Sequence, residues 1–117
     1  MIEGRLIRLS DLQPTCPPDH KDTHSYEIIS RNTVGAKHIE FLLSEVQPGG
    51  EAEENIHLSS EHAYFMISGV GEAKVEGKTF TLHPEDCLFI PPGAKHSIKP
   101  IGGEGIRLIV IFAPPKE

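Results

Sequence analysis

The sequence has little of what marks several large classes of protein. It has no tryptophan and two cysteines, Cys16 and Cys87, which are too few for a disulfide framework. No apolar run approaches the roughly 20 residues of a membrane-spanning helix, and the N-terminus lacks the apolar segment of a secretory signal. No stretch is rich in lysine and arginine. We therefore expect no membrane partner, no nucleic-acid partner and a reducing, cytoplasmic location.

The bulk composition is that of one ordinary globular domain. The chain has 117 residues, of which 38% are apolar and 24% charged, and its formal net charge is −6 with the acidic residues scattered. This length suits a single domain with a sizeable core. Eleven glycines and ten prolines interrupt the chain at short intervals. Such punctuation is typical of an all-β protein rather than a helical one.

Short segments of β character lie between these interruptions. They predict strands over 5–9, 25–30, 38–46, 62–67, 72–75, 79–82, 87–90, 96–99 and 107–112. A Pro-rich loop covers 13–19, and Glu-Gly-Lys at 76–78 predicts a tight hairpin turn. We expect the strand from 38 to stop at the Pro-Gly-Gly of 48–50. Regular short strands with turn signals favour a sandwich or a jelly-roll barrel.

Three of the seven histidines, His57, His62 and His96, lie in two blocks separated by a Gly-rich hairpin. Neutral imidazole is the commonest side-chain metal ligand. Two histidines from one strand–turn–strand unit and a third from another hairpin can converge inside a small barrel. A divalent metal site is therefore the leading functional hypothesis. The competing interpretation is three solvated or core histidines whose spacing matches by accident.

The first block opens with Pro-Gly-Gly at 48–50 and continues through the histidines to Tyr-Phe-Met-Ile-Ser-Gly-Val-Gly at 64–71. The second block ends with Ile-Pro-Pro-Gly-Ala-Lys-His at 90–96. Together these blocks resemble the cupin superfamily, and the resemblance implies an all-β jelly-roll barrel with a metal between its sheets. We expect a single cupin domain over 1–117, with N-terminal strands and the Pro-rich loop in 1–37 and the conserved barrel in 38–115.

The cupin pattern usually supplies His-x-His and an acidic residue from the first block, and a final histidine from the second. Here the resemblance places Asn55 at the first position, His57 at the second, His62 at the acidic position and His96 at the last. A histidine at the acidic position, in a Glu-His pair that opens the strand, occurs among the small single-domain cupins. The resemblance thus implies three histidine ligands, with Asn55 in place of a fourth.

The fourth position stays open between several interpretations. An amide oxygen is a weak ligand beside imidazole, so Asn55 either completes the site, bonds a metal-bound water or caps the turn. Glu53 is the best substitute ligand if Asn55 does not bind. A three-histidine site suits one divalent ion per chain, Fe, Mn, Ni, Cu or Zn, and ligand softness does not choose among them. The open positions leave room for water or substrate.

Alternation along the strands nominates the side chains that surround the site. Counting from His62 places Tyr64 and Met66 on the metal side. Tyr64 would orient substrate or act as an acid, and the competing interpretation is a packed barrel aromatic. Three further apolar residues are expected to line the same cavity and exclude water: Leu88, Ile90 and Ile98.

Arg107 is the second candidate catalytic residue. It shares one face of its strand with Ile109 and Ile111. If that face points inward, the guanidinium could clamp a carboxylate with two hydrogen bonds. The competing interpretation is an arginine that faces solvent near the strand start.

Other possible ligands lie outside both blocks. Cys16, His20 and His24 are spaced like ligands, but their Pro-rich and Asp-rich surroundings predict a surface loop. His83 precedes Pro84 in a turn and is expected to be exposed.

The sequence predicts a metal-dependent enzyme that acts on a small polar or carboxylate-bearing molecule, with dioxygenase-like chemistry as the first hypothesis. A Lewis-acid isomerase or lyase would use the same ligands. A non-catalytic cupin that binds a sugar or another small metabolite would need no redox metal. We expect a homodimer whose N-terminal strands pair across a twofold axis. No phosphate loop or dinucleotide fingerprint is present.

Overall fold

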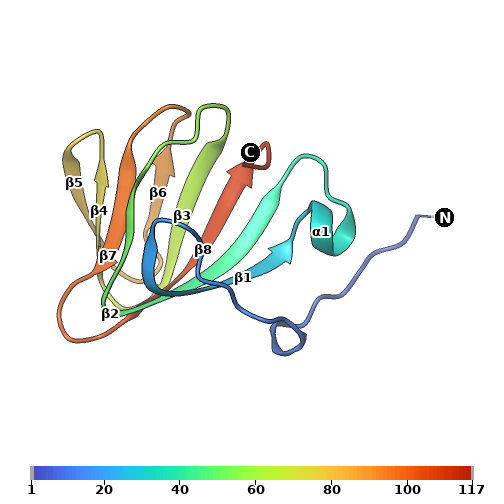
Figure 1. Ribbon diagram of the computed structural model, residues 1–117, viewed down its shortest axis with the longest axis horizontal. Helices are drawn as coiled ribbons and strands as arrows, with labels where there is room; N and C mark the ends of the chain where they lie inside the picture. The colour runs from blue at the N-terminus through green and yellow to red at the C-terminus, as the bar shows by residue number, and fades with distance from the viewer. Residues whose placement is uncertain (1, 117) are drawn as a thin grey trace.

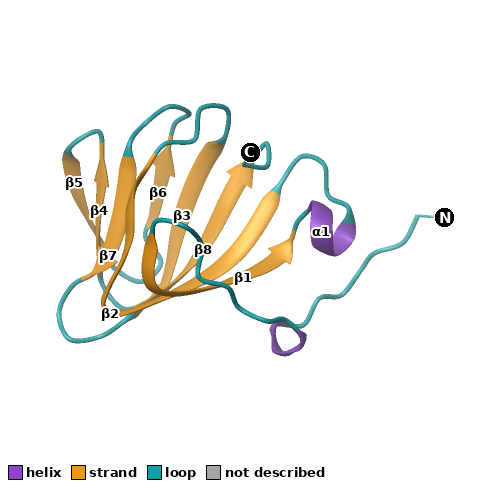
Figure 2. Cartoon of the chain, viewed as in Figure 1, coloured by secondary structure: helices purple, strands orange, loops and turns teal. Residues whose placement is uncertain are grey.

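The computed structural model describes residues 2–116 (for Glu54, the backbone alone), and its strands wrap into a barrel (Figure 1). The eight strands are β1 (His20–Ile29), β2 (Glu40–Asn55), β3 (Glu61–Ser68), β4 (Gly71–Val75), β5 (Lys78–Leu82), β6 (Cys87–Ile90), β7 (His96–Pro100) and β8 (Ile106–Ala113). Two short helical segments are η1 (Leu9–Asp11) and α1 (Arg31–Val34). Figure 2 shows how small these helical parts are beside the sheet.

The sheet runs in the order β5-β4-β7-β2-β8-β3-β6, and β1 pairs with β2 beside this path. The long strand β2 joins the two halves of the barrel. Its first part, 40–46, pairs with β8, whereas Ala52 and Asn55 pair with β7. All of these pairings are antiparallel. The all-β jelly-roll prediction is therefore confirmed.

The prediction that a strand stops at 48–50 is wrong, because β2 continues through the Pro-Gly-Gly sequence to Asn55. Here β2 passes very close to β1. A Cβ atom built on Gly50 would lie 2.6 Å from the backbone oxygen of Lys21. The pairing of β1 with β2 shifts register between Lys21 and Thr23. Glycine at this point lets the strand bend and cross between the two halves of the barrel instead of ending.

Two N-terminal predictions also need correction. The strand expected over 5–9 does not form, and this arm leads instead into η1. Its side chains have no core to enter, since Ile2 and Leu6 are exposed. The strand expected over 25–30 begins earlier, at His20, and the segment after it contains α1, where Ser30 and Thr33 form reciprocal capping hydrogen bonds. The hairpin turn expected at 76–78 is confirmed between β4 and β5.

The core follows the alternation of the strands. On β8 every second side chain is buried, from Ile106 to Phe112. On β3 the buried side chains are His62, Tyr64 and Met66. One end of the interior is thus filled by aliphatic side chains around Met66, and the other end carries imidazole and aromatic rings.

Candidate metal centre

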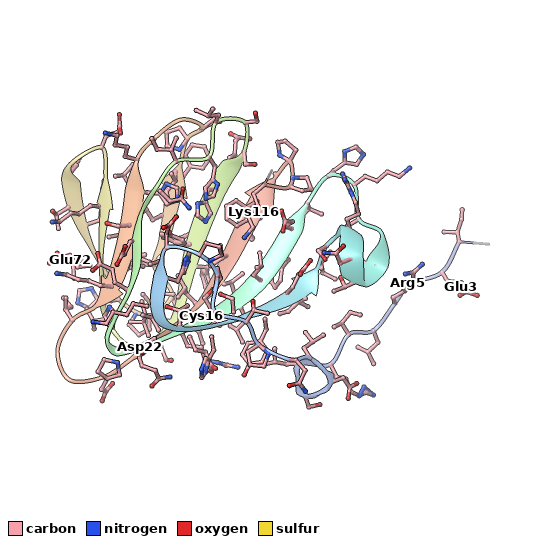
Figure 3. All side chains as sticks on the ribbon, in the orientation of Figure 1. Glu3, Arg5, Cys16, Asp22, Glu72 and Lys116 are labelled. Atoms are coloured by element: carbon pink, nitrogen blue, oxygen red, sulfur yellow. The ribbon has the colours of Figure 1, made fainter. Side chains whose placement is uncertain are left out.

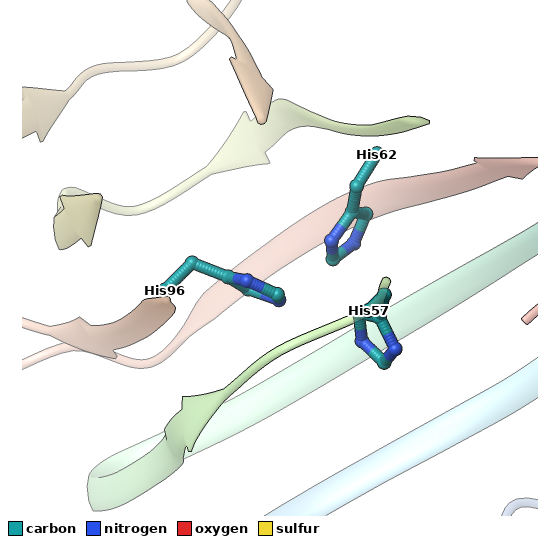
Figure 4. Close-up of side chains that lie close together, drawn as sticks. All are labelled: His57, His62 and His96. Atoms are coloured by element: carbon teal, nitrogen blue, oxygen red, sulfur yellow. The ribbon is translucent and has the colours of Figure 1, made fainter. Parts of the chain in front are cut away.

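His57, His62 and His96 converge inside the barrel from three different segments (Figure 4). His57 lies on the loop after β2, His62 near the start of β3, and His96 at the start of β7. One ligand atom from each residue lies within 4.8 Å of the others. Within residues 2–116, these three histidines are the group of three or more histidine, cysteine or carboxylate side chains whose ligand atoms are close enough together to hold a metal ion.

A turn between the two blocks positions His57. Its backbone carbonyl accepts a hydrogen bond from the Gly93 N–H at 2.8 Å. Gly93 has φ +83° in a turn closed by a 3.3 Å hydrogen bond from Ala94 N–H to the Pro91 carbonyl. Proline followed by glycine with positive φ is what a type II turn requires. The Pro-Pro-Gly sequence of the second block therefore holds the histidine of the first.

His96 is oriented by hydrogen bonds that involve the two residues before it. The preceding residue, Lys95, is fixed to the hairpin tip, because its N–H donates to Glu76 Oε2 at 2.9 Å and its carbonyl accepts from the Glu76 N–H at 2.8 Å. The Nδ1 of His96 lies 3.0 Å from the Ala94 carbonyl. Because a carbonyl only accepts, Nδ1 carries the proton and Nε2 is left with the lone pair that a metal needs.

His62 is the most enclosed member of the group. Its ring stacks on Phe112 with centroids 4.1 Å apart and meets Tyr64 edge-on at 4.7 Å. Both ring nitrogens are buried without a hydrogen-bond partner in the described structure. Burying an unpartnered polar atom is costly. A metal ion bound to one of these nitrogens would remove much of that cost. The three histidines therefore fit a bound metal ion.

The electrostatics of the site keep the imidazoles neutral. Burial, together with a smaller effect of the neighbouring His96, lowers the pKa of His57 to about 4 and the pKa of His62 to about 2. Burial also lowers the pKa of His96, against the opposing effect of its hydrogen bond to Ala94. Neutral imidazole is the form that coordinates a metal. Burial raises the pKa of the Tyr64 phenol, which therefore remains protonated at neutral pH.

The two candidates for the fourth ligand lie at the edge of the site. Asn55 lines the cavity opposite His96 in the β2–β7 pairing, and its Oδ1 accepts a hydrogen bond from the Ile56 N–H at 2.8 Å. Glu53 is exposed and also lines the cavity. Its ligation, like that of Asn55, stays a prediction.

The cavity around the histidines has a volume of about 210 Å³. Tyr64 faces it, as the alternation predicts, and so does Ile98. Ile90 is buried and Leu88 partly buried in the core, but neither lines the cavity. Its apolar walls come instead from β2 and β8: Leu42, Val46, Leu108 and Val110.

Arg107 is not among the residues that line this cavity. It alternates with the buried residues of β8, and its Nε donates to Glu45 Oε2 at 3.2 Å. Its side chain is 40% exposed. The solvent-facing alternative therefore describes its position, and the guanidinium does not reach the histidines.

Two residues that the sequence interpretation left outside the site line the cavity. His20 opens β1, and its Nδ1 lies 2.8 Å from the Pro18 carbonyl. Cys16 is exposed as expected, and His24 is exposed but lies in β1 rather than in the expected loop. Lys116 follows β8 and also lines the cavity (Figure 3). The ligand-like spacing of His20 was a usable signal, but nothing local in the sequence marks Lys116. His83 is exposed as predicted, with 64% side-chain exposure.

The chain belongs to the cupin family, since a family model described as a cupin domain matches residues 42–112. "Polyketide synthase CurC" from Streptomyces cyaneus is 26% identical over 92% of this chain and 70% of its own length. "5-nitrosalicylic acid 1,2-dioxygenase" from a Bradyrhizobium species is 30% identical over 56% of this chain and 31% of its own length. The chain therefore spans under a third of the dioxygenase.

Solved structures show the same fold. A "predicted oxalate decarboxylase" from Thermotoga maritima has a TM-score of 0.83 at 19% identity, covering 95% of this chain and 100% of that one. The polyketide cyclase RemF from Streptomyces resistomycificus has a TM-score of 0.83 at 22% identity, covering 97% of this chain and 82% of that one. In residues 2–116, none of the helices has the length and apolar character needed to span a bilayer.

Proposed function

We propose that this protein is a metal-dependent cupin enzyme that acts on a small polar or carboxylate-bearing molecule, with one divalent transition-metal ion held by His57, His62 and His96. The observation that carries the proposal is the pair of buried, unpartnered ring nitrogens on His62, within ligand distance of two further neutral imidazoles. A bound ion would supply Lewis acidity and open positions for substrate or dioxygen.

The chain's own residues supply the rest of the site. The Nδ1–H of His96 holds that ring in one tautomer through the Ala94 carbonyl. The protonated phenol of Tyr64, which lines the cavity, is available to donate a hydrogen bond to a substrate oxygen. The walls formed by Leu42, Leu108 and Val110 limit water around the bound molecule.

Oxygen-dependent chemistry is the first form of this proposal, and the likeness to the dioxygenase supports it. The second form is Lewis-acid isomerase or lyase chemistry, which would use the same three histidine ligands without dioxygen. The two forms differ in oxygen consumption: the first requires uptake of dioxygen with turnover, and the second proceeds equally well under anaerobic conditions. The non-catalytic alternative predicts ligand binding without turnover and without dependence on a metal.

The proposal is tested by metal analysis of protein purified without a His tag, beside a His57→Ala/His96→Ala variant. We expect roughly one Fe, Mn, Ni, Cu or Zn per chain, lost in the variant. A Lys95→Ala/Ser97→Ala variant, whose changes flank His96, serves as the matched control and should keep its metal. Protein that holds no metal, and takes up none on titration, contradicts the proposal.

We also propose that two chains form a dimer through their N-terminal segments. Ile2 and Leu6 are exposed on an arm that leaves the barrel (Figure 1), and β1 forms an edge of the sheet beside β2. A second copy would cover both features. Light scattering should give twice the chain mass of 12.9 kDa. Ile2→Asp/Leu6→Asp should give the chain mass, and a monomeric wild type would contradict the dimer.

A further inference from the structure

Lys116 is fixed at the cavity by the segment that follows β8. The Pro114 carbonyl accepts a hydrogen bond of 2.7 Å from the Ser60 hydroxyl, and the Lys116 N–H donates to Glu40 Oε1 at 2.6 Å. Ser60 is 2% exposed and Glu40 is 8% exposed. Two buried side chains from distant parts of the sequence therefore hold this segment, which we call the C-terminal strap (residues 114–116), against the barrel.

The strap places the Lys116 ammonium beside the histidine cluster. Its Nζ lies 5.1 Å from the centroid of the Phe112 ring, and that ring stacks on His62 at 4.1 Å. Phe112 also meets the His57 ring at 4.9 Å. Phe112 thus contacts both the ammonium and two of the candidate metal ligands, and Lys116 lines the same cavity as those ligands.

The side-chain ammonium of Lys116 forms no ion pair with a carboxylate within the described residues. The ion pairs there are His83–Asp86 and Arg107–Glu45. The other charged residues that line the cavity are Asp19 and Glu53, both exposed and neither paired with Lys116. Among the described residues, Lys116 is the one lysine or arginine that lines the cavity.

We propose that Lys116 selects ligands with an anionic group, and that a carboxylate of the ligand pairs with its ammonium while the rest of the molecule enters the cavity toward the histidines. The inference rests on the proposed function in that it takes this cavity as the substrate site. An ammonium held over an aromatic face is partly desolvated, which strengthens its pairing with a carboxylate. The proposed substrates are therefore small acids rather than small polar molecules in general.

The test compares benzoate with benzamide, which have the same shape and differ in charge. Binding is measured by NMR titration on the protein as purified and after treatment with a chelator. We expect benzoate to bind about tenfold more tightly than benzamide to the wild type, as a charge-assisted hydrogen bond would give. Lys116→Met should bring this ratio close to one in both preparations, and Lys116→Arg should retain most of it.

Lys78→Met is the matched control. The Lys78 ammonium also lies 5.1 Å from a phenylalanine ring, that of Phe80, but neither residue lines the cavity. The ratio should be unchanged in this variant. A wild-type ratio near one, a ratio that survives Lys116→Met, or no binding of either probe would overturn the proposal.

The two preparations separate this inference from the metal proposal. A preference for benzoate that survives Lys116→Met but disappears with the chelator assigns carboxylate recognition to the metal, which overturns the role of Lys116 and supports the metal centre. A preference that depends on Lys116 in protein that never binds metal supports the role of Lys116 while the metal proposal fails.

Discussion

The two ends of the barrel use the same strands for opposite purposes. At one end, which we call the closed end, Met66 on β3 is fully buried beside Leu108 and Ile106 of β8. At the other, the histidine end, the same two strands present His62 and Phe112, and both nitrogens of His62 are unpartnered. The closed end is packed with apolar side chains, whereas the histidine end buries polar atoms that have no hydrogen-bond partner. Buried polar atoms of this kind are typical of a binding site and unfavourable in a stable core.

The strongest test of the closed end is Met66→Ala. Removing a fully buried side chain from a packed core should lower the free energy of unfolding by about 2–5 kcal/mol. Ile67→Ala, on the neighbouring position of β3, is the control, because Ile67 is 37% exposed on the other face and should lose much less. Urea denaturation measures both variants. If Met66→Ala cost no more than Ile67→Ala, the closed end would not be the source of stability.

At the histidine end, His62→Leu should raise the free energy of unfolding of the metal-free protein instead of lowering it. Leucine replaces an unpartnered buried imidazole with an apolar side chain of similar size, so the metal-free protein should gain about 1 kcal/mol of stability. The same change should abolish metal uptake. Denaturation in the presence of a chelator measures the first effect, and metal titration the second. Lower stability of the metal-free variant would show that the imidazole is well accommodated without metal.

The histidine end should also make the metal-free protein sensitive to acid. Folding lowers the pKa of His57 from 6.5 to about 4 and lowers that of His62 still further. The unfolded chain therefore binds more protons below pH 6.5, and stability falls as the pH drops from about 6.5 toward 4. Melting temperatures at pH 7 and pH 5.5 should differ more in the wild type than in His62→Leu. Equal differences would argue that His62 titrates normally.

The smallest effect is expected from Arg107→Ala, on the outer face of β8. The exposed pair with Glu45 should contribute about 0.2–1 kcal/mol to stability. Because Arg107 does not line the cavity, benzoate binding should match the wild type. A large loss of benzoate binding would support the carboxylate clamp by Arg107 that the sequence analysis considered. It would contradict the assignment of Arg107 to the outer face of β8.

The sequence predicted the parts of the fold that local chemistry determines. Alternation identified the inner faces of β3 and β7, and the Glu-Gly pair at 76–77 identified the β4–β5 hairpin. It failed where tertiary contact decides the outcome. The Pro-Gly-Gly sequence bends β2 instead of ending it because β1 packs against Gly50, and the arm over 5–9 has no neighbouring strand to pair with.

The same distinction applies to the site. The grouping of His57, His62 and His96 could be predicted from their spacing and from the resemblance to cupins. The structure places one ligand atom of each within 4.8 Å of the others. Lys116 could not be found in this way. Its place depends on the hydrogen bond from Ser60 to the Pro114 carbonyl and on that from the Lys116 N–H to Glu40. Ser60 and Glu40 are far from it in the sequence and lie outside any motif. The inward or outward direction of Arg107 likewise depended on which face of β8 is buried.

The most direct measurement of the central claim is the metal content per chain of tag-free protein, compared with His57→Ala/His96→Ala. We expect roughly one transition-metal ion per chain in the wild type and none in the variant, with both proteins folded by circular dichroism. A wild type that neither contains nor takes up metal would contradict the proposed metal centre. The histidine end would then be a binding cavity for small molecules rather than a metal centre.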